Sequence, residues 1–246
     1  MTLRTYRSPG VWLILLPVGL VACATPPAQE AADATSPAST GYRASGNEPF
    51  WHLTFGETTI DLSVLGRDEL SRSAARPEPE AAGNGWRYRT AANGQPLTVR
   101  IEVRRCNDSM SGRPFPHTVS VTVGGETFKG CGGDTASLLT GNEWAVDELD
   151  GVPVPGSHPP TLLFASDGAL TGTGGCNQFR SSYEITGEGI RIGAIRVTLR
   201  ACADSAANER ETRFLTLLQH VSRFDIAEDG SLVLFEGDTP VIRAGR

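Results

Sequence analysis

The sequence predicts a mainly β protein with two small antiparallel β-barrel-like domains, the second carrying one amphipathic helix. Apolar and polar residues alternate with a period of two along several segments, which is typical of strands with one buried face. A helical period occurs only once. The 28 glycines and 16 prolines are roughly 18% of the chain against a usual roughly 12%, which favours short elements joined by turns. A signal peptide and a disordered tether are expected before the two domains.

Residues 1–22 have the pattern of a signal peptide. Arg4 and Arg7 precede an apolar run of 12 residues that begins at Val11 and ends at Ala22. A membrane-spanning helix needs about 20 apolar residues, so this run is too short for an ordinary transmembrane anchor. We therefore predict an export signal that is removed from the mature chain.

The apolar run ends in Leu20-Val21-Ala22-Cys23, which resembles the lipobox of bacterial lipoproteins. The resemblance implies cleavage before Cys23, lipidation of that cysteine with three acyl chains, and stable membrane anchoring, since two chains already suffice. The alternative is a plain secretory signal cleaved near Ala22 or Ala24. By analogy with lipoprotein sorting, Ala24 favours the outer membrane, with the body of the protein facing the periplasm.

The segment 23–41 is predicted to be the lipidated cysteine and a flexible tether, because it is rich in Ala, Pro, Ser and Thr and has no apolar period. Loss of residues 1–22 leaves 20 basic and 28 acidic residues, a formal net charge of −8. Such an acidic chain lacks the basic surface that nucleic-acid binding requires, so no nucleic-acid partner is expected.

An N-terminal β domain is predicted over residues 42–133. Four segments alternate with a period of two, and between them lie the turn-rich stretches 72–85 and 91–96. The apolar positions of the four segments are Trp51, Leu53 and Phe55; Ile60, Leu62 and Val64; Leu97, Val99, Ile101 and Val103; and Val119, Val121 and Val123. An antiparallel meander follows from this pattern.

A second β domain is predicted over residues 141–246, after a short link at 132–141. Strands are expected at 144–149, 161–164, 183–186, 190–195 and 231–235. One helical stripe interrupts them, formed by Phe214, Leu217, Leu218 and Val221 at spacings of three and four. Asp204 or Ser205 can cap this helix, and Glu209 and Glu211 suit its first turns.

Four cysteines remain once Cys23 is set aside, and an oxidising compartment would pair them as disulfides. Three connectivities are open. The economical one pairs cysteines within each half, Cys106 with Cys131 and Cys176 with Cys202. The spacings fit no metal-binding motif, so no metal site and no cofactor are expected.

The second half contains a set of motif residues: Trp144, Gly174, Gly175, Cys176, Asn177, Phe179, Tyr183, Thr198, Cys202, Glu211, Phe214, Leu215 and Leu218. Through these residues it resembles, over about residues 141–243, the META domain family, also named for the heat-shock lipoprotein HslJ. The resemblance implies a β-barrel-like fold, an envelope location and an association with stress tolerance, without an established reaction.

The first half resembles a small uncharacterised periplasmic domain that often begins Gly-Asn-Glu-Pro-Phe-Trp. The matching residues here are Gly46, Asn47, Glu48, Pro49, Phe50 and Trp51, then Cys106, Asp108, Met110, Ser111, Gly112, Phe115, Pro116, Gly130, Cys131 and Gly132.

No catalytic residue is predicted. Phosphate-loop and nucleophile-elbow motifs are absent, and Lys129 is the only lysine available for amine chemistry. The four histidines, His52, His117, His158 and His220, are expected at the surface or rim of the domains. The glycine-rich stretch 172–175 is predicted to be a turn with positive φ, and Asn177 a turn residue that tolerates left-handed φ.

Glu48 and Asp108 could form a carboxylate pair for glycoside chemistry, although turn formation or backbone capping explains each of them more simply. The sequence does not reveal whether they are near each other.

Three functional hypotheses follow. The first is a non-enzymatic, lipid-anchored envelope protein that supports outer-membrane integrity or stress tolerance. Its partner would be the membrane, through the lipid on Cys23, with a periplasmic protein or a small ligand as a further partner. The alternative is a periplasmic inhibitor or binder of a cationic hydrolase such as a lysozyme. A cell-wall glycan enzyme acting through Glu48 and Asp108 ranks last.

Overall fold

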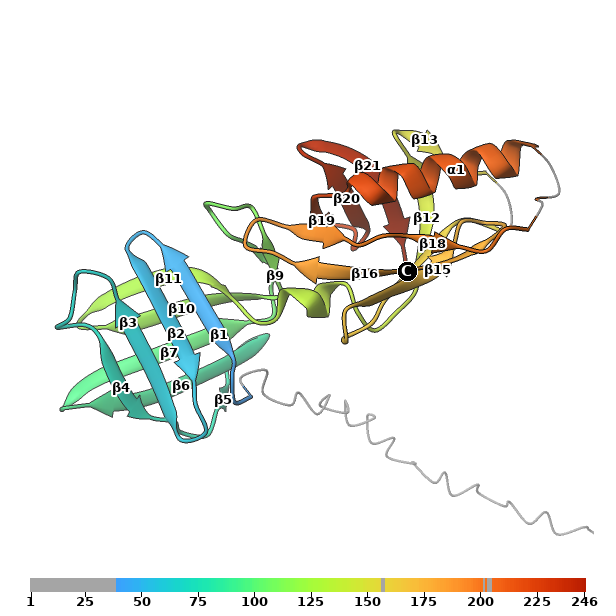
Figure 1. The fold of residues 1–246 in the computed structure, drawn as a ribbon. Helices are drawn as coiled ribbons and strands as arrows, with labels where there is room; N and C mark the ends of the chain where they lie inside the picture. The colour runs from blue at the N-terminus through green and yellow to red at the C-terminus, as the bar shows by residue number, and fades with distance from the viewer. Residues whose placement is uncertain (1–38, 156–157, 201, 203–204) are drawn as a thin grey trace, which may run out of the picture. The chain divides into compact units, whose positions relative to one another are not determined.

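The structure, a computed structural model, describes residues 39–155, 158–200, 202 and 205–246 (Figure 1). The predicted signal peptide 1–22, Cys23 and the tether as far as residue 38 lie outside the described residues. Within the described part, no helix combines the length and the hydrophobicity needed to cross a bilayer.

The first sheet is antiparallel and has nine strands in the order β4-β3-β2-β1-β11-β10-β7-β6-β5. Its strands are β1 (Arg43–Asn47), β2 (Phe50–Phe55), β3 (Thr59–Val64), β4 (Arg72–Ala75), β5 (Glu80–Ala81), β6 (Gly85–Ala92), β7 (Gln95–Glu102), β10 (His117–Val123) and β11 (Glu126–Gly132). A loop between β7 and β10 carries a separate two-stranded ribbon, β8 (Cys106–Asn107) and β9 (Pro114–Phe115).

The alternating apolar residues of this sheet form one core. Trp51, Phe55 and Tyr88 are fully buried, as are the apolar positions of β7 and β10. The sheet is strongly curled, and its two ends approach each other. The contact between them includes a 2.8 Å hydrogen bond that the Thr90 hydroxyl of β6 donates to the Ala75 carbonyl of β4. The sheet thus has the predicted barrel-like form, because the apolar faces of its strands surround a single core.

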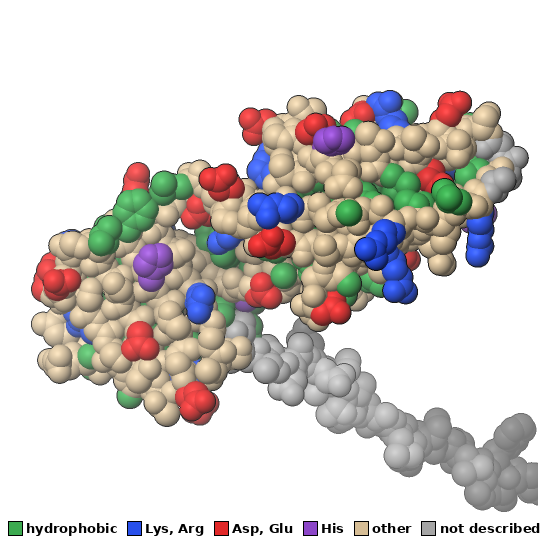
Figure 2. All heavy atoms as spheres, in the orientation of Figure 1, with side chains coloured by type: hydrophobic (Ala, Val, Ile, Leu, Met, Phe, Trp, Pro, Cys, Tyr) green, Lys and Arg blue, Asp and Glu red, His purple; other side chains and the backbone are tan. Residues whose placement is uncertain are grey.

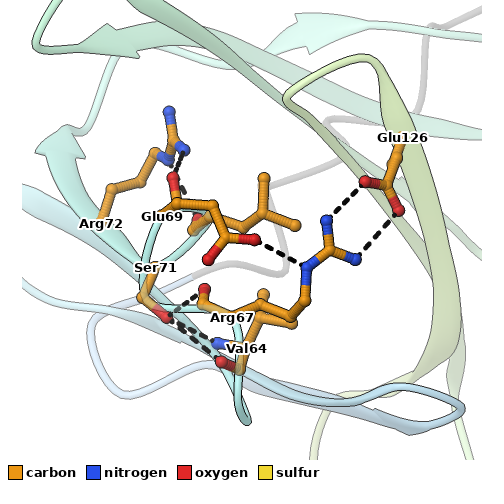
Figure 3. A network of polar contacts seen from close by, with 7 residues as sticks. Val64, Arg67, Glu69, Ser71, Arg72 and Glu126 are labelled. Atoms are coloured by element: carbon orange, nitrogen blue, oxygen red, sulfur yellow. Dashed lines mark hydrogen bonds and ion pairs between the residues drawn. The ribbon is translucent and has the colours of Figure 1, made fainter.

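A polar cluster on the rim of the first sheet joins the β3–β4 connection to the β10–β11 turn (Figure 3). The Arg67 guanidinium binds Glu126 at 2.7 Å and Glu69 at 2.7 Å, and its hydrogen bonds raise its pKa further while they lower those of both glutamates. Beneath it, the Ser71 hydroxyl accepts a hydrogen bond from the Val64 amide at 2.9 Å. The ion pairs are exposed, so we assign them to turn positioning rather than to stability.

Gly130 allows β11 to approach β1 closely. A Cβ at this position would collide with the Ser45 carbonyl and with the Trp51 ring. We expect Gly130→Ala to destabilise the N-terminal sheet by about 2 kcal/mol, because neither backbone nor buried indole can give way. The measurement is the midpoint of thermal unfolding. The control is Gly187→Ala, where a new Cβ meets open space, and an equal effect of both variants would contradict the prediction.

The second sheet is also antiparallel and has ten strands. The main order is β17-β16-β15-β14-β12-β21-β20-β19, with β13 paired to β12 and β18 paired to β16. Its strands are β12 (Trp144–Leu149), β13 (Val152–Pro153), β14 (Thr161–Phe164), β15 (Ala169–Thr173), β16 (Gln178–Ile185), β17 (Ile190–Ile192), β18 (Arg196–Val197), β19 (Arg223–Ile226), β20 (Leu232–Glu236) and β21 (Thr239–Gly245).

One helix, α1 (Ser205–His220), packs on this second sheet (Figure 1). The predicted stripe is confirmed, because Phe214 and Leu218 are fully buried and Val221 nearly so, in a core that includes Trp144. The Trp144 indole N–H donates to the Leu139 carbonyl at 2.8 Å, so this buried polar group is satisfied.

The predicted fold class is confirmed: the described chain is mainly β, with curled antiparallel sheets and one α-helix. Two expected strands, 144–149 and 161–164, match β12 and β14 residue for residue. The turn-rich stretch 72–85 was underestimated, since it contains β4 and β5. The expected link 132–141 contains a 3-10 helix, η1 (Thr135–Leu138). The proposed division into domains 42–133 and 141–246 stays a prediction.

Candidate functional site

The motif residues of the N-terminal sheet gather around one open cleft of about 700 Å³. One wall is formed by β1, the turn after it and β11, and the other by the loop that carries β8. The lining contains residues from two stretches that are far apart in the sequence: Asn47, Glu48 and Phe50 from the first, and Asp108 and Met110 from the second. Trp51 lies below the cleft, fully buried, and its indole N–H donates to the Lys129 carbonyl at 3.3 Å.

The β8 loop is held against the sheet in two ways. A disulfide joins Cys106 of β8 to Cys131 of β11, with the two Cα atoms 5.4 Å apart. The Asn47 amide donates to the Asp108 carboxylate and to the Ser109 hydroxyl, each at 2.9 Å. The second wall of the cleft therefore depends on a covalent link and on one side chain of β1.

Asp108 organises the tip of this loop. Its Oδ1 accepts hydrogen bonds from the Met110 amide at 3.1 Å, the Ser111 amide at 2.8 Å and the Ser111 hydroxyl at 2.8 Å. Burial alone would raise the pKa of Asp108, but the hydrogen bonds from Ser111, Asn47 and Met110 outweigh it and lower that pKa below the ordinary value. The carboxylate is therefore held ionised as a cap of the loop, as the capping interpretation expects.

We expect Asp108→Asn to loosen the β8 loop, because an asparagine in this place presents two N–H groups toward the Asn47 amide or the loop amides. The stabilisation from a lowered carboxylate pKa is present above the pKa of an unfolded aspartate and is lost as the pH falls through the lower folded value. The measurement is the carboxyl titration followed by NMR, together with the amide exchange of residues 108–112. A titration at the ordinary aspartate pKa would contradict this description.

The rim of the cleft combines both charge signs with apolar groups. Glu48 and the only lysine, Lys129, are exposed, and Phe50 and Met110 leave 44% and 71% of their surface in solvent. The lining has no histidine. Glu48 and Asp108 thus line the same cleft, but Asp108 is committed to the loop. This arrangement suits binding of a partially apolar partner better than proton transfer.

The META-like motif residues form a second polar cluster, which lies under the surface of the second sheet. Glu211, on α1, is 95% buried, and Oε1 accepts from the Asn177 amide at 2.6 Å and from the Cys176 amide at 3.3 Å. Its Oε2 accepts from the Asn177 side-chain amide at 2.7 Å. In turn, the Asn177 Oδ1 accepts from the Thr198 hydroxyl at 3.0 Å and from the Arg200 amide at 2.7 Å.

This cluster corrects two expectations. Asn177 does not have a left-handed φ. It is buried, and its side chain forms hydrogen bonds that join α1 to the segment after β18. Glu211, expected only to suit the first turns of the helix, is buried and accepts hydrogen bonds from the backbone amides of Cys176 and Asn177. The expected positive φ in the stretch 172–175 is confirmed at Gly175, which has a φ of +105°. A Cβ at position 174 would overlap the Glu211 side chain, which explains why a glycine, Gly174, stands before Gly175.

A second disulfide lies beside this cluster and joins Cys176 to Cys202, with Cα atoms 5.6 Å apart. Both predicted pairings are therefore present in the structure. The two sulfurs and a Glu211 oxygen lie within 4.8 Å of one another. Sulfurs joined in a disulfide are not thiolates, and the carboxylate already binds amide N–H groups, so these atoms suit a structural role.

The predicted positions of the histidines hold in part. His52, His158 and His220 are exposed. His117 is half-buried, 3.4 Å from the Tyr42 hydroxyl, and burial lowers its pKa. Burial also raises the pKa of Tyr42, with a smaller contribution from Tyr88.

The sequence interpretation missed the role of Glu211, although a signal was present. Glu211 precedes Phe214 by three positions and Leu218 by seven, so it lies on the buried face of the helix. A carboxylate on an apolar stripe indicates a buried partner, and the Gly-Cys-Asn turn provides it.

A family model supports the assignment of the second half. A family model described as "META domain" matches residues 137–245. Two solved structures, both NMR structures, cover 45% of this chain with a TM-score of 0.38 each. The first is 19% identical and 94% covered; the second, from Burkholderia xenovorans, is 22% identical and 85% covered. No curated protein matches the chain. Residues 137–245, with their curled sheet, single helix and buried Glu211–Asn177 cluster, are thus a META domain.

Proposed function

We propose that the chain is a lipid-anchored envelope protein with a non-enzymatic role in outer-membrane integrity or stress tolerance. The observation that carries the proposal is the lipobox-like sequence ending at Cys23, placed where the apolar run of the signal stops. Both disulfides of the described residues support it, because such bonds persist in oxidising compartments such as the periplasm.

The use of the motif side chains supports a non-enzymatic role. Asp108 and Glu211 each bind backbone amides and an asparagine side chain, so both serve as acceptors within the protein. General acid–base catalysis requires a group within reach of substrate and free to exchange a proton. The two motif carboxylates that hold the loops together are better suited to preserving the shape of a binding surface.

Replacement of Cys23 by serine tests the anchoring. We expect the wild-type chain in the outer-membrane fraction and the Cys23→Ser chain in the soluble periplasmic fraction, because the serine variant cannot receive the thioether-linked lipid. Fractionation with immunoblotting and the mass of the mature N-terminus provide the measurement. A serine variant that remained in membranes would contradict the lipobox interpretation.

The alternative function is a periplasmic binder or inhibitor of a cationic hydrolase such as a lysozyme, and the cleft favours it specifically. Exposed Phe50 and Met110 beside Glu48 offer apolar contact and negative charge in one place. The predicted mature net charge of −8 would also attract a basic partner over a distance. Capture from envelope extract at low and moderate salt tests this alternative, with Phe50→Ser, Met110→Ser double replacement as the binding-deficient control.

A further inference from the structure

The META domain has a second hollow, which the polar cluster borders but does not fill. This groove of about 590 Å³ lies over β14, β15, β16 and β18 and is lined by residues between Glu143 and Thr198. Its volume falls within the range of small-molecule sites, roughly 300–1,000 Å³. Figure 2 shows basic side chains on the surface of the second sheet around the place where Figure 1 marks the C-terminus, beside the labels of β15 and β16.

Two arginines are held side by side in this groove. Arg180 of β16 and Arg196 of β18 are directly opposite each other in the antiparallel pairing, so their side chains leave the same face of the sheet. Both are exposed, and neither forms an ion pair with a carboxylate among the described residues. Like charges in such a pair repel each other, and a bound anion would remove that cost.

Two other arginines of the META domain, by contrast, are paired with carboxylates. Arg191 pairs with Glu184 at 3.2 Å, and Arg213 pairs with Asp150 at 2.5 Å. The contrast matters because the whole chain is acidic, with 28 acidic against 22 basic residues. An arginine pair without a carboxylate in such a protein is a local positive site in a negative surrounding.

The hydroxyl groups at the floor of the groove divide into two sets. Thr173 donates to the Asn177 carbonyl at 3.1 Å, Thr198 donates to Asn177 Oδ1, and the Thr161 hydroxyl accepts from the Thr173 amide at 3.3 Å. These three threonines connect the groove to the buried cluster. The Thr171 hydroxyl and the Gln178 side-chain amide have no such bond within the described residues and face the same groove.

The chemistry of the free groups defines a class of ligand. A guanidinium binds phosphate or carboxylate oxygens through two parallel N–H donors, and two guanidiniums can share one phosphate. A hydroxyl and an amide beside them can each donate to and accept from a ligand hydroxyl. We propose that this groove binds a phosphorylated sugar, either free or as the headgroup of a lipid, with Arg180 and Arg196 on the phosphate and Gln178 and Thr171 on the sugar hydroxyls.

Glu143 lines the same groove and carries the opposite charge. It forms no ion pair with either arginine within the described residues. Its carboxylate would repel the phosphate and accept from a sugar hydroxyl. This gives the proposal a directional test, because removal of the charge should strengthen phosphate binding while removal of either arginine weakens it.

The test is calorimetric titration of the oxidised full chain with glucose phosphate, with glucose and inorganic phosphate as separate probes. We expect glucose phosphate to bind most tightly. Arg180→Gln and Arg196→Gln should each weaken it about tenfold, the size of one charge-assisted pair, and Glu143→Gln should strengthen it. Arg191→Gln is the matched control, an exposed arginine of the same sheet that is already paired, and should leave the affinity unchanged. Circular dichroism of each variant confirms that it is folded.

Three results would overturn the proposal. If glucose phosphate binds no more tightly than glucose, the arginines have no role in binding. The same conclusion follows if the Arg180→Gln, Arg196→Gln and Arg191→Gln chains bind glucose phosphate with equal affinity. Equal affinity for inorganic phosphate and glucose phosphate would remove the sugar from the assignment. Co-sedimentation with phosphatidylcholine vesicles, with or without phosphatidylinositol monophosphate, then separates the two sources: binding only to the phosphorylated vesicles assigns a lipid headgroup, and binding only to the soluble sugar assigns a free one.

Discussion

Glu211→Ala should destabilise the META domain by about 3 kcal/mol, because it leaves three buried N–H groups of Cys176 and Asn177 without an acceptor. The amide of a glutamine would preserve one acceptor and turn its NH₂ toward the Asn177 side-chain amide. We therefore expect Glu211→Gln to cost about 2 kcal/mol. Urea unfolding of the oxidised chain, with hydrogen exchange measured on peptides of β15 and β16, gives both values.

Glu209→Gln is the matched control, since Glu209 lies on the same helix and is exposed. Its effect should stay within about 0.5 kcal/mol. A Glu211→Ala protein as stable as this control would mean that the amides of the 174–177 turn find other acceptors, and the buried cluster would lose its structural role.

Replacing Cys106 and Cys131 together by serine should destabilise the N-terminal sheet by about 3.5 kcal/mol in the chain-entropy model, given the separation of 25 residues. A local effect is also expected. The β8 loop would remain attached through Asn47 and Asp108 alone, so amide exchange at residues 106–112 should rise most. Thermal unfolding and site-resolved exchange are the measurements.

Cys176→Ser, Cys202→Ser is the comparison, with a separation of 26 residues and a similar expected entropic cost. This second replacement should raise exchange in the META domain and leave residues 106–112 unchanged. Non-reducing peptide mapping of the wild-type chain should recover the two pairs separately. A peptide linking Cys106 to Cys176 or to Cys202 would contradict the pairing described above.

The strands and the helix could be predicted to the extent that each buries one face. The period-two segments of β2, β3, β7 and β10 and the stripe of α1 are local signals, and most of their apolar residues are buried as expected. Val103 is an exception, since it follows the end of β7 and is 52% exposed, and Leu217 of the stripe is only half-buried. β4 and β5 were missed because their short, polar sequences pair at the ends of a curled sheet, where few side chains enter the core. Pairing at a sheet end depends on the rest of the sheet rather than on the segment itself.

The site residues illustrate a different limit. The motifs single out Asn47, Asp108 and Asn177, but they do not predict which residues these side chains contact. Asn47 and Asp108 are 61 residues apart in the sequence, and Asn177 and Glu211 are 34 residues apart. Asn177 was assigned to a left-handed turn because asparagine often adopts that conformation. Its tertiary hydrogen bonds decide its role instead, and they depend on where α1 lies.

The position of Lys129 gives the protein an uncommon experimental property. Apart from the chain's own N-terminus, it is the only primary amine in the sequence, and it lies at the cleft of the N-terminal sheet. An amine-reactive probe would therefore label one known side chain without any engineered cysteine, leaving both disulfides intact. A fluorophore or photo-crosslinker attached there would report directly on whatever enters that cleft.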